Sequence, residues 1–202
     1  MGWEYPLTLI NRHHRWRALL HRPDQMKYKT ILVVVILGLV SPQAGCTQTM
    51  SWSAVDKMIR TSFPAVHQLS TDSLAAWLNS DTIPQPTLLD IRTAEEYTVS
   101  HLRGALRVAP ETNDFTFLDS LDRSTPLVTY CSVGYRSSEV VQRMKEAGFT
   151  NVSNLEGSIF RWANEGHPVY RDDKPVREVH PFDGVWGRLL NAELRATEPK
   201  SQ

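Results

Sequence analysis

Short apolar segments of strand character alternate with amphipathic helical segments through residues 66–170, and this alternation most constrains the fold. Two adjacent parallel strands need a crossover between them, and a helix that packs back on the sheet provides it. The chain therefore predicts an α/β fold in which helices cover both faces of a parallel sheet. Strands are expected at 67–69, 87–91, 106–109, 126–130 and 151–155, and helices at 53–61, 71–79, 115–121, 137–147 and 158–165.

Local signals support several of these helices. Thr93 followed by Glu96 forms the pattern of a capping box, in which the hydroxyl accepts from the third helical N–H and the carboxylate reaches back. Gly148 is a suitable C-terminal stop for the helix before it. In the segment 115–121, the side chains of Phe117, Leu118 and Leu121 are expected to face the core.

The charge distribution excludes some partners. Lys and Arg number 22, as do Asp and Glu, but the first 29 residues carry a net charge of +4 and the remainder −4. A basic nucleic-acid-binding surface is not expected on the folded part. Cys46 and Cys131 are the two cysteines, so the chain is not a disulfide scaffold.

The N-terminal region has the features of a targeting signal. Basic residues near Met26 precede the apolar run 31–40, which at helical rise spans about 15 Å, roughly half a bilayer core. That length is typical of a signal-peptide core. Small residues then lead into Cys46, and the segment 41–46 resembles the lipobox of bacterial lipoproteins, although Gln43 stands where that pattern prefers an aliphatic residue.

This interpretation predicts a lipid attached to Cys46 and a periplasm-facing lipoprotein of the bacterial cell envelope. The alternative is an uncleaved signal that anchors the chain in the inner membrane. The expected organisation is an over-extended start or basic n-region at 1–25, a signal peptide at 26–45, a tether with a short helix at 46–65, one domain at 66–170, and a C-terminal extension at 171–202.

The chemistry is expected at Cys131. A strand leads directly into Cys131-Ser-Val-Gly-Tyr-Arg-Ser137, and a helix follows. Such a loop turns successive backbone N–H groups toward one point, and the helix N-terminus adds partial positive charge. Gly134 relieves the steric limits on the loop, and Arg136 adds a permanent cation. Together these features favour a thiolate and a bound anion over a cysteine that merely fills the core.

At this loop the chain resembles the rhodanese-like family, whose loop reads C-x-x-G-x-R-S. Residues 88–105, with Asp90, Arg92, Glu96 and His101, are similar to the family's D-x-R-x-x-x-E-Y and H-I-x-G-A elements. A third motif lies at 148–169, where the family usually has two glycines and this chain has Gly157 and Ser158. That change is not expected to touch the loop.

The resemblance implies a rhodanese-like fold and a sulfurtransferase that needs no cofactor or metal. Cys131 would take sulfane sulfur from thiosulfate or another small anionic donor, form a persulfide, and pass the sulfur to a thiol or cyanide-like acceptor. Arg136 would hold the anion, and Asp90 and Arg92 would brace the sheet end. The residues assigned to substrate binding are Ser132, Val133, Gly134, Tyr135 and Ser137.

Two rival functions stay open. Rhodanese-fold phosphatases and arsenate reductases place five residues between cysteine and arginine, whereas four separate Cys131 from Arg136. The shorter loop favours sulfur transfer. A module that binds a persulfide or a protein partner without turnover is the other alternative.

The C-terminal extension carries an apolar pattern of its own. Val185, Trp186, Leu189, Leu190 and Leu194 predict a helix that packs back on the domain. The alternative is a helix that docks to a partner or to a membrane surface.

Overall fold

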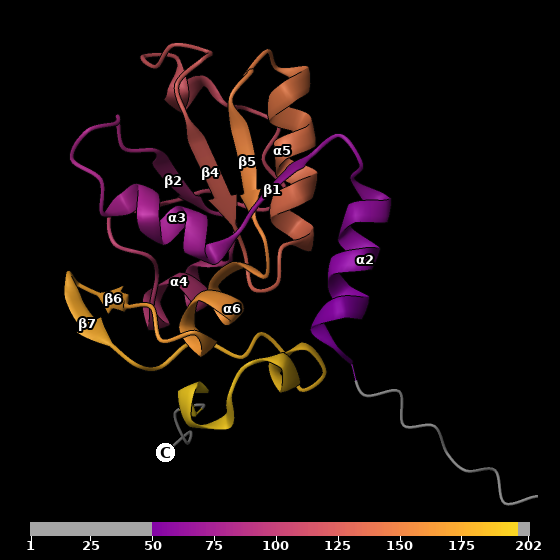
Figure 1. Ribbon diagram of the computed structural model, residues 1–202, viewed down its shortest axis with the longest axis vertical. Helices are drawn as coiled ribbons and strands as arrows, with labels where there is room; N and C mark the ends of the chain where they lie inside the picture. The colour runs from indigo at the N-terminus through magenta and orange to yellow at the C-terminus, as the bar shows by residue number, and fades with distance from the viewer. Residues whose placement is uncertain (1–49, 198–202) are drawn as a thin grey trace, which may run out of the picture. The chain divides into compact units, whose positions relative to one another are not determined.

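The computed structural model describes residues 50–197. Its centre is a parallel sheet of five strands in the order β1-β5-β4-β2-β3 (Figure 1). This arrangement confirms the predicted α/β class. The strands are β1 (His67–Leu69), β2 (Thr87–Asp90), β3 (Leu106–Arg107), β4 (Leu127–Tyr130) and β5 (Val152–Leu155).

Strand β4 occupies the middle of this sheet, between β2 and β5. Leu88 pairs with Val128 on one side, and Val128 pairs with Ser153 on the other. All four residues of β4 are buried, as expected for a strand covered on both faces. The residue that follows β4 therefore emerges at the centre of the sheet's C-terminal edge, where α/β proteins commonly bind ligands.

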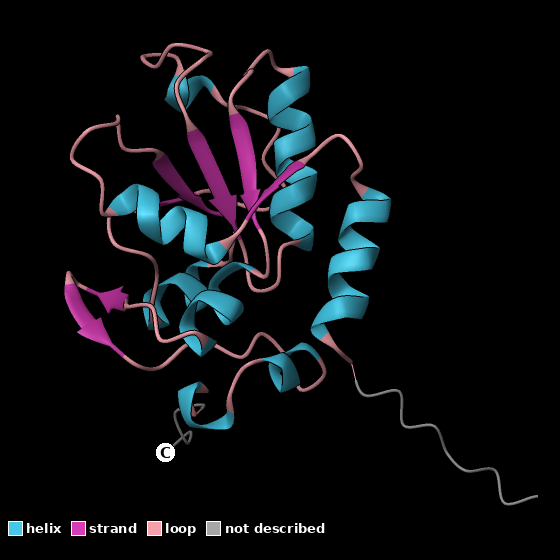
Figure 2. Cartoon of the chain, in the orientation of Figure 1, coloured by secondary structure: helices cyan, strands magenta, loops and turns pink. Residues whose placement is uncertain are grey.

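Helices pack around the sheet (Figure 2), with α2 and α5 on one side in this view and α3 on the other (Figure 1). The capping box predicted for Thr93 and Glu96 is present at the start of α4. Helix α2 buries Val55 and Ile59 against the core. The helices are α2 (Trp52–Ser62), α3 (Thr71–Leu78), α4 (Ala94–Val99), α5 (Tyr135–Glu146) and α6 (Ser158–Asn164).

Two predicted helices differ from the structure. The segment 115–121 forms only the 3-10 turn η1 (Thr116–Leu118). Phe115 and Leu118 are buried, whereas Phe117, expected in the core, is 49% exposed. Residues three apart share a face in a 3-10 turn. Phe115 therefore lies on the buried face with Leu118, and Phe117 does not.

The C-terminal extension does not form the single helix expected from its apolar pattern. It forms two 3-10 turns, η2 (Trp186–Leu189) and η3 (Ala192–Leu194), because Leu190 has an extended backbone between them. Leu189, Leu190 and Leu194 are buried as predicted, whereas Val185 is exposed.

A short antiparallel hairpin joins the core to this extension. It consists of β6 (Val169–Arg171) and β7 (Lys174–Val176). Asp172 and Asp173 both have positive φ, as a two-residue turn between twisted antiparallel strands requires. Among residues 50–197, no helix is both long and apolar enough to cross a membrane.

Candidate active site

Cys131 lies at the end of the central strand, in the turn between β4 and α5. Its side chain is 1% exposed, and the N–H of Gly134 donates a hydrogen bond to Sγ at 3.1 Å. Helix α5 begins at Tyr135, two residues earlier than the sequence indicated. The turn is therefore short, and the N-terminus of α5 lies close to the sulfur atom.

Gly134 makes this tight turn feasible. It has φ +111°, a conformation that side chains strongly disfavour. A Cβ atom there would lie 3.1 Å from Nδ2 of Asn154 and 3.3 Å from Cδ1 of Ile59. The backbone conformation therefore favours glycine, and a larger residue would also have to displace these two side chains by a few tenths of an ångström.

The surroundings of Cys131 favour its thiolate. Burial alone raises the pKa of the thiol. The positive charge of Arg136, together with hydrogen-bonding groups of Ser137 and Gly134, outweighs burial, so the pKa of Cys131 is lowered from its ordinary value. The sulfur is therefore a better nucleophile near neutral pH than a buried cysteine in an apolar core.

A charged network holds Arg136 next to the loop. Its Nη1 and Nη2 atoms donate to the two carboxylate oxygens of Glu96, each at 2.8 Å. The hydroxyl of Ser132 donates to Glu96 at 2.7 Å and accepts from Arg136 at 3.0 Å. Burial opposes ionisation of Glu96, but the hydrogen bonds and charge of Arg136 lower the pKa of Glu96 to about 2. At neutral pH the carboxylate thus compensates the charge of Arg136.

Glu96 is a site residue that sequence reasoning missed. The capping box by itself accounts for a glutamate at position 96, so the sequence offered no reason to assign Glu96 to the site. The capping interaction is present, because the N–H of Thr93 donates to Oε2 of Glu96 at 3.1 Å. The same carboxylate also reaches Arg136, 40 residues further along the chain. Only its position within the second family motif could have drawn attention to it.

Ser158 corrects another expectation. The replacement of the family's second glycine was expected not to touch the loop, yet the Ser158 hydroxyl accepts a hydrogen bond from the N–H of Cys131 at 3.1 Å. It also donates to the carbonyl of Leu155 at 3.1 Å. The loop carbonyls of Cys131 and Ser132 accept from the N–H groups of Ile159 and Phe160. The start of α6 therefore fixes the position of the nucleophile.

Asp90 and Arg92, which were assigned support roles, form a buried ion pair at the end of β2. Arg92 donates to the two Asp90 oxygens at 2.8 and 2.6 Å and to the carbonyl of Ser100 at 2.6 Å. Burial lowers the pKa of Arg92, but Asp90 more than offsets this and the net pKa is raised. Their hydrogen bonds order the edge of the sheet next to Cys131 and do not include its sulfur atom.

The remaining loop residues divide into two groups. Val133 and Tyr135 line the pocket at Cys131, whereas the Ser137 hydroxyl is fully buried and donates to Oδ1 of Asn154 at 2.6 Å. Ser137 thus joins the loop to Asn154 of β5 and does not line the pocket. Cys46, the predicted lipid-attachment site, lies outside the described residues.

The pocket over Cys131 has a volume of about 160 Å³. Its lining includes two aromatic residues of the C-terminal extension, Phe182 and Trp186. The Phe182 ring lies against the guanidinium group of Arg136, 4.6 Å from its central carbon. Sequence reasoning missed both aromatic residues, because nothing local links them to a loop about fifty residues upstream.

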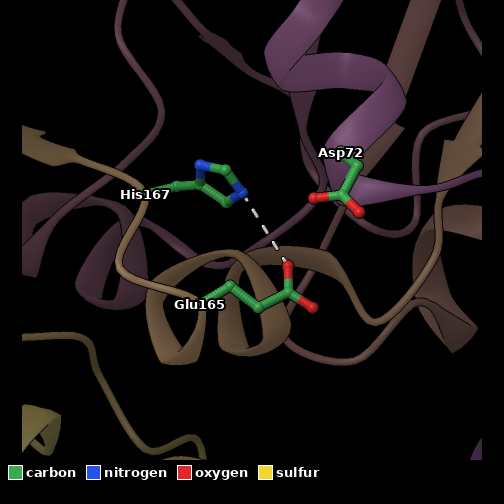
Figure 3. Close-up of side chains that lie close together, drawn as sticks. All are labelled: Asp72, Glu165 and His167. Carbon is green, nitrogen blue, oxygen red and sulfur yellow. Dashed lines mark ion pairs between the residues drawn. The ribbon is translucent and has the colours of Figure 1, made fainter.

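One group among the described residues could hold a metal ion. Asp72, Glu165 and His167 offer ligand atoms within 4.8 Å of one another (Figure 3). His167 Nε2 lies 3.8 Å from Oε2 of Glu165. The two carboxylates are exposed, and none of the three residues lines the pocket at Cys131.

Comparisons with known proteins find a matching family and several relatives. Residues 70–165 match the Rhodanese-like domain family. The chain is 33% identical over 97 residues to "Probable adenylyltransferase/sulfurtransferase MoeZ" of Mycobacterium tuberculosis, covering 47% of this chain and 24% of that protein. It is 32% identical over 83 residues to "Thiosulfate sulfurtransferase GlpE" of Actinobacillus pleuropneumoniae, covering 41% of this chain and 76% of that protein.

A solved structure shares the fold. The crystal structure of a thiosulfate sulfurtransferase from Pseudomonas aeruginosa superimposes with a TM-score of 0.50 at 20% identity, over 59% of this chain and 23% of that chain. The chain therefore spans about a quarter of the MoeZ protein and of this structure, but most of the GlpE protein.

Proposed function

Because this chain belongs to the rhodanese-like domain family, we propose that it is a sulfurtransferase that carries sulfane sulfur on Cys131. One observation supports this most strongly. Cys131 directly follows the central strand, its sulfur atom accepts the N–H of Gly134, and the pKa of its thiol is lowered beside Arg136. That arrangement prepares a thiolate to attack an electrophilic sulfur atom.

The first half-reaction, written for thiosulfate, forms the persulfide. The Cys131 thiolate attacks the outer sulfur of thiosulfate, a new S–S bond forms, and the old S–S bond breaks. Sulfite leaves with the electron pair of the broken bond, and Cys131 becomes a persulfide anion. The N–H of Gly134 and the N-terminus of α5 stabilise this anion, as they stabilise the thiolate.

The second half-reaction returns the enzyme to its starting state. A nucleophilic acceptor such as cyanide or a thiolate attacks the outer sulfur of the persulfide. The S–S bond breaks, the acceptor leaves carrying the sulfur atom, and the Cys131 thiolate is regenerated. Ping-pong kinetics follow from this sequence, because the first product leaves before the acceptor binds.

The test is formation of thiocyanate from thiosulfate and cyanide. The protein is expected to turn over and to gain the mass of one sulfur atom after treatment with donor alone. Cys131→Ser should show neither, while Glu95→Gln, at an exposed side chain that does not line the pocket, should still gain the sulfur and turn over. A protein that accepts no sulfur from any donor would contradict the proposal and favour a binding module.

We also propose that a lipid on Cys46 tethers this domain to the bacterial cell envelope, facing the periplasm. The small residues before Cys46 and the preceding apolar run support this. Mass spectrometry of the membrane-extracted protein should find an acylated N-terminal Cys46, and Cys46→Ala should lose the acyl group. A mature chain that retains residues 26–45 would instead support an uncleaved inner-membrane anchor.

A further inference from the structure

Within the C-terminal extension, residues 179–196 form a loop whose two ends are hydrogen-bonded to each other and which is also bonded to the rest of the domain. The N–H of Val179 donates to the carbonyl of Leu194 at 2.7 Å, and the N–H of Ala196 donates to the carbonyl of Val179 at 2.9 Å. Asn164, at the end of α6, donates to the carbonyl of Leu189 at 2.7 Å and accepts from the N–H of Asn191 at 2.8 Å. These contacts tie both the ends and the middle of the loop.

This loop presents two aromatic side chains to the pocket over Cys131. Phe182 and Trp186 form part of the pocket lining, together with the family loop residues Val133 and Tyr135. Phe182 has φ +66°, which is unfavourable for a phenylalanine and is maintained only where surrounding structure enforces it. Its N–H donates to Nδ1 of His180 at 3.0 Å, which helps to hold that conformation.

The charges at the pocket do not favour a strongly anionic donor. Apart from the Cys131 thiolate, Arg136 is the one charged side chain that lines it, within the part of the chain that the structure describes. Both ends of its guanidinium group are engaged by Glu96, and one face lies against Phe182. Together, Arg136, Glu96 and the Cys131 thiolate carry a formal charge of −1. A dianion such as thiosulfate is therefore attracted mainly by loop N–H groups.

The size of the pocket matches a small apolar group. Its volume of about 160 Å³ is close to the ~150 Å³ of an engineered apolar cavity that binds benzene in another protein. Four of its lining side chains are apolar or aromatic: Val133, Tyr135, Phe182 and Trp186. Aromatic side chains in the lining favour a bound aromatic ring in edge-to-face or offset contact with them.

We propose that the C-terminal extension is part of the active site, and that Phe182 and Trp186 select sulfur donors whose leaving group carries a small apolar substituent. This rests on the proposed sulfurtransferase function and names its donor class. Such donors are organic thiosulfonates and persulfides that carry an aryl or short alkyl group and at most one negative charge.

The transfer from an aryl thiosulfonate is balanced without another reactant. The Cys131 thiolate attacks the terminal sulfur of benzenethiosulfonate, and the bond between the two sulfur atoms of the donor breaks. Benzenesulfinate leaves with the electron pair, and the Cys131 persulfide anion remains. The ring stays on the leaving group, where Phe182 and Trp186 can contact it.

The test compares three donors with cyanide as the common acceptor. Benzenethiosulfonate and methanethiosulfonate share the reacting group but differ in the ring, and thiosulfate adds a second charge. The three donors differ in intrinsic reactivity. For each donor, the measured quantity is therefore the ratio of kcat/KM in the variant to kcat/KM in the unsubstituted protein. Phe182→Asn removes the ring while tolerating the positive φ, and Val185→Ala is the matched control on an exposed side chain of the same loop.

Phe182→Asn is expected to lower kcat/KM for benzenethiosulfonate by about 2- to 13-fold, which corresponds to the free energy measured for an aromatic pair contact. Its kcat/KM for methanethiosulfonate and thiosulfate should change less than about 2-fold, and Val185→Ala should leave all three unchanged. Trp186→Leu, which removes the second aromatic ring of the extension from the lining, should reproduce the selective loss.

The outcomes separate the two proposals. Equal loss for all three donors, or no loss for benzenethiosulfonate in either variant, would overturn the donor class while leaving sulfur transfer intact. Failure of every donor to form a persulfide on Cys131 in the unsubstituted protein would overturn the proposed function, and the donor class with it.

Discussion

The ion pair between Glu96 and Arg136 should make stability depend on pH in the acid range. The side chain of Glu96 is 2% exposed, and that of Arg136 is 22% exposed. The pKa of Glu96 is about 2 in the folded protein, against an ordinary value of 4.5. At about 1.4 kcal/mol per pKa unit, this difference corresponds to about 3 kcal/mol of folding stability, and partial exposure of Arg136 reduces it to about 2–3 kcal/mol.

The sign follows from the lowered pKa. A carboxylate whose folded pKa is depressed contributes its full stability above the unfolded pKa of about 4.5, and this contribution is lost as pH falls toward 2. Glu96→Gln removes the charge, while glutamine can still serve in the capping box with Thr93. The variant should therefore be less stable than the unsubstituted protein at pH 7, and the gap should close between pH 4.5 and 2.

Urea unfolding at a series of pH values from 7 to 2.5 measures this gap. Glu95→Gln is the matched control, because Glu95 lies in the same helical turn and its side chain is exposed. Its effect should stay within about 0.5 kcal/mol, as for most surface substitutions. A gap for Glu96→Gln that does not change with pH, or that is no larger than the control's, would refute the reasoning.

Three further predictions concern the loop and the sheet edge. Ser158→Ala should lower the free energy of unfolding by about 1–3 kcal/mol, measured by urea denaturation, because it leaves the buried N–H of Cys131 without its partner; an unchanged midpoint would contradict this. Arg136→Met should shift the pH profile of Cys131 alkylation by iodoacetamide to higher pH, because the charge of Arg136 helps to lower the thiol pKa; a profile at the same pH would refute that role. Asp90→Asn should cost about 3–5 kcal/mol in thermal or urea unfolding, because Arg92 would keep a buried charge without its counterion, and a loss below about 1 kcal/mol would show that the pair is not isolated from water.

The strand and helix order could be predicted because it depends on local patterns. Buried parallel strands read as short apolar runs, and the run before Cys131 became the fully buried β4. The capping box of Thr93 and Glu96 is likewise set within four residues. Errors occurred where packing chose between similar local structures, as at Phe117, where a 3-10 turn replaced a longer helix.

The residues of the candidate site also fall into those set by a local sequence pattern and those set by tertiary packing. The sequence by itself determined the nucleophile and its loop, because Cys131, Gly134 and Arg136 lie within one turn between a strand and a helix. Only the tertiary structure decided what surrounds them. Glu96 approaches from α4, the Ser158 hydroxyl from the start of α6, and the Phe182 ring from the C-terminal extension. A local pattern reports the conformation of its own segment, whereas these three contacts depend on how distant segments pack around the end of β4.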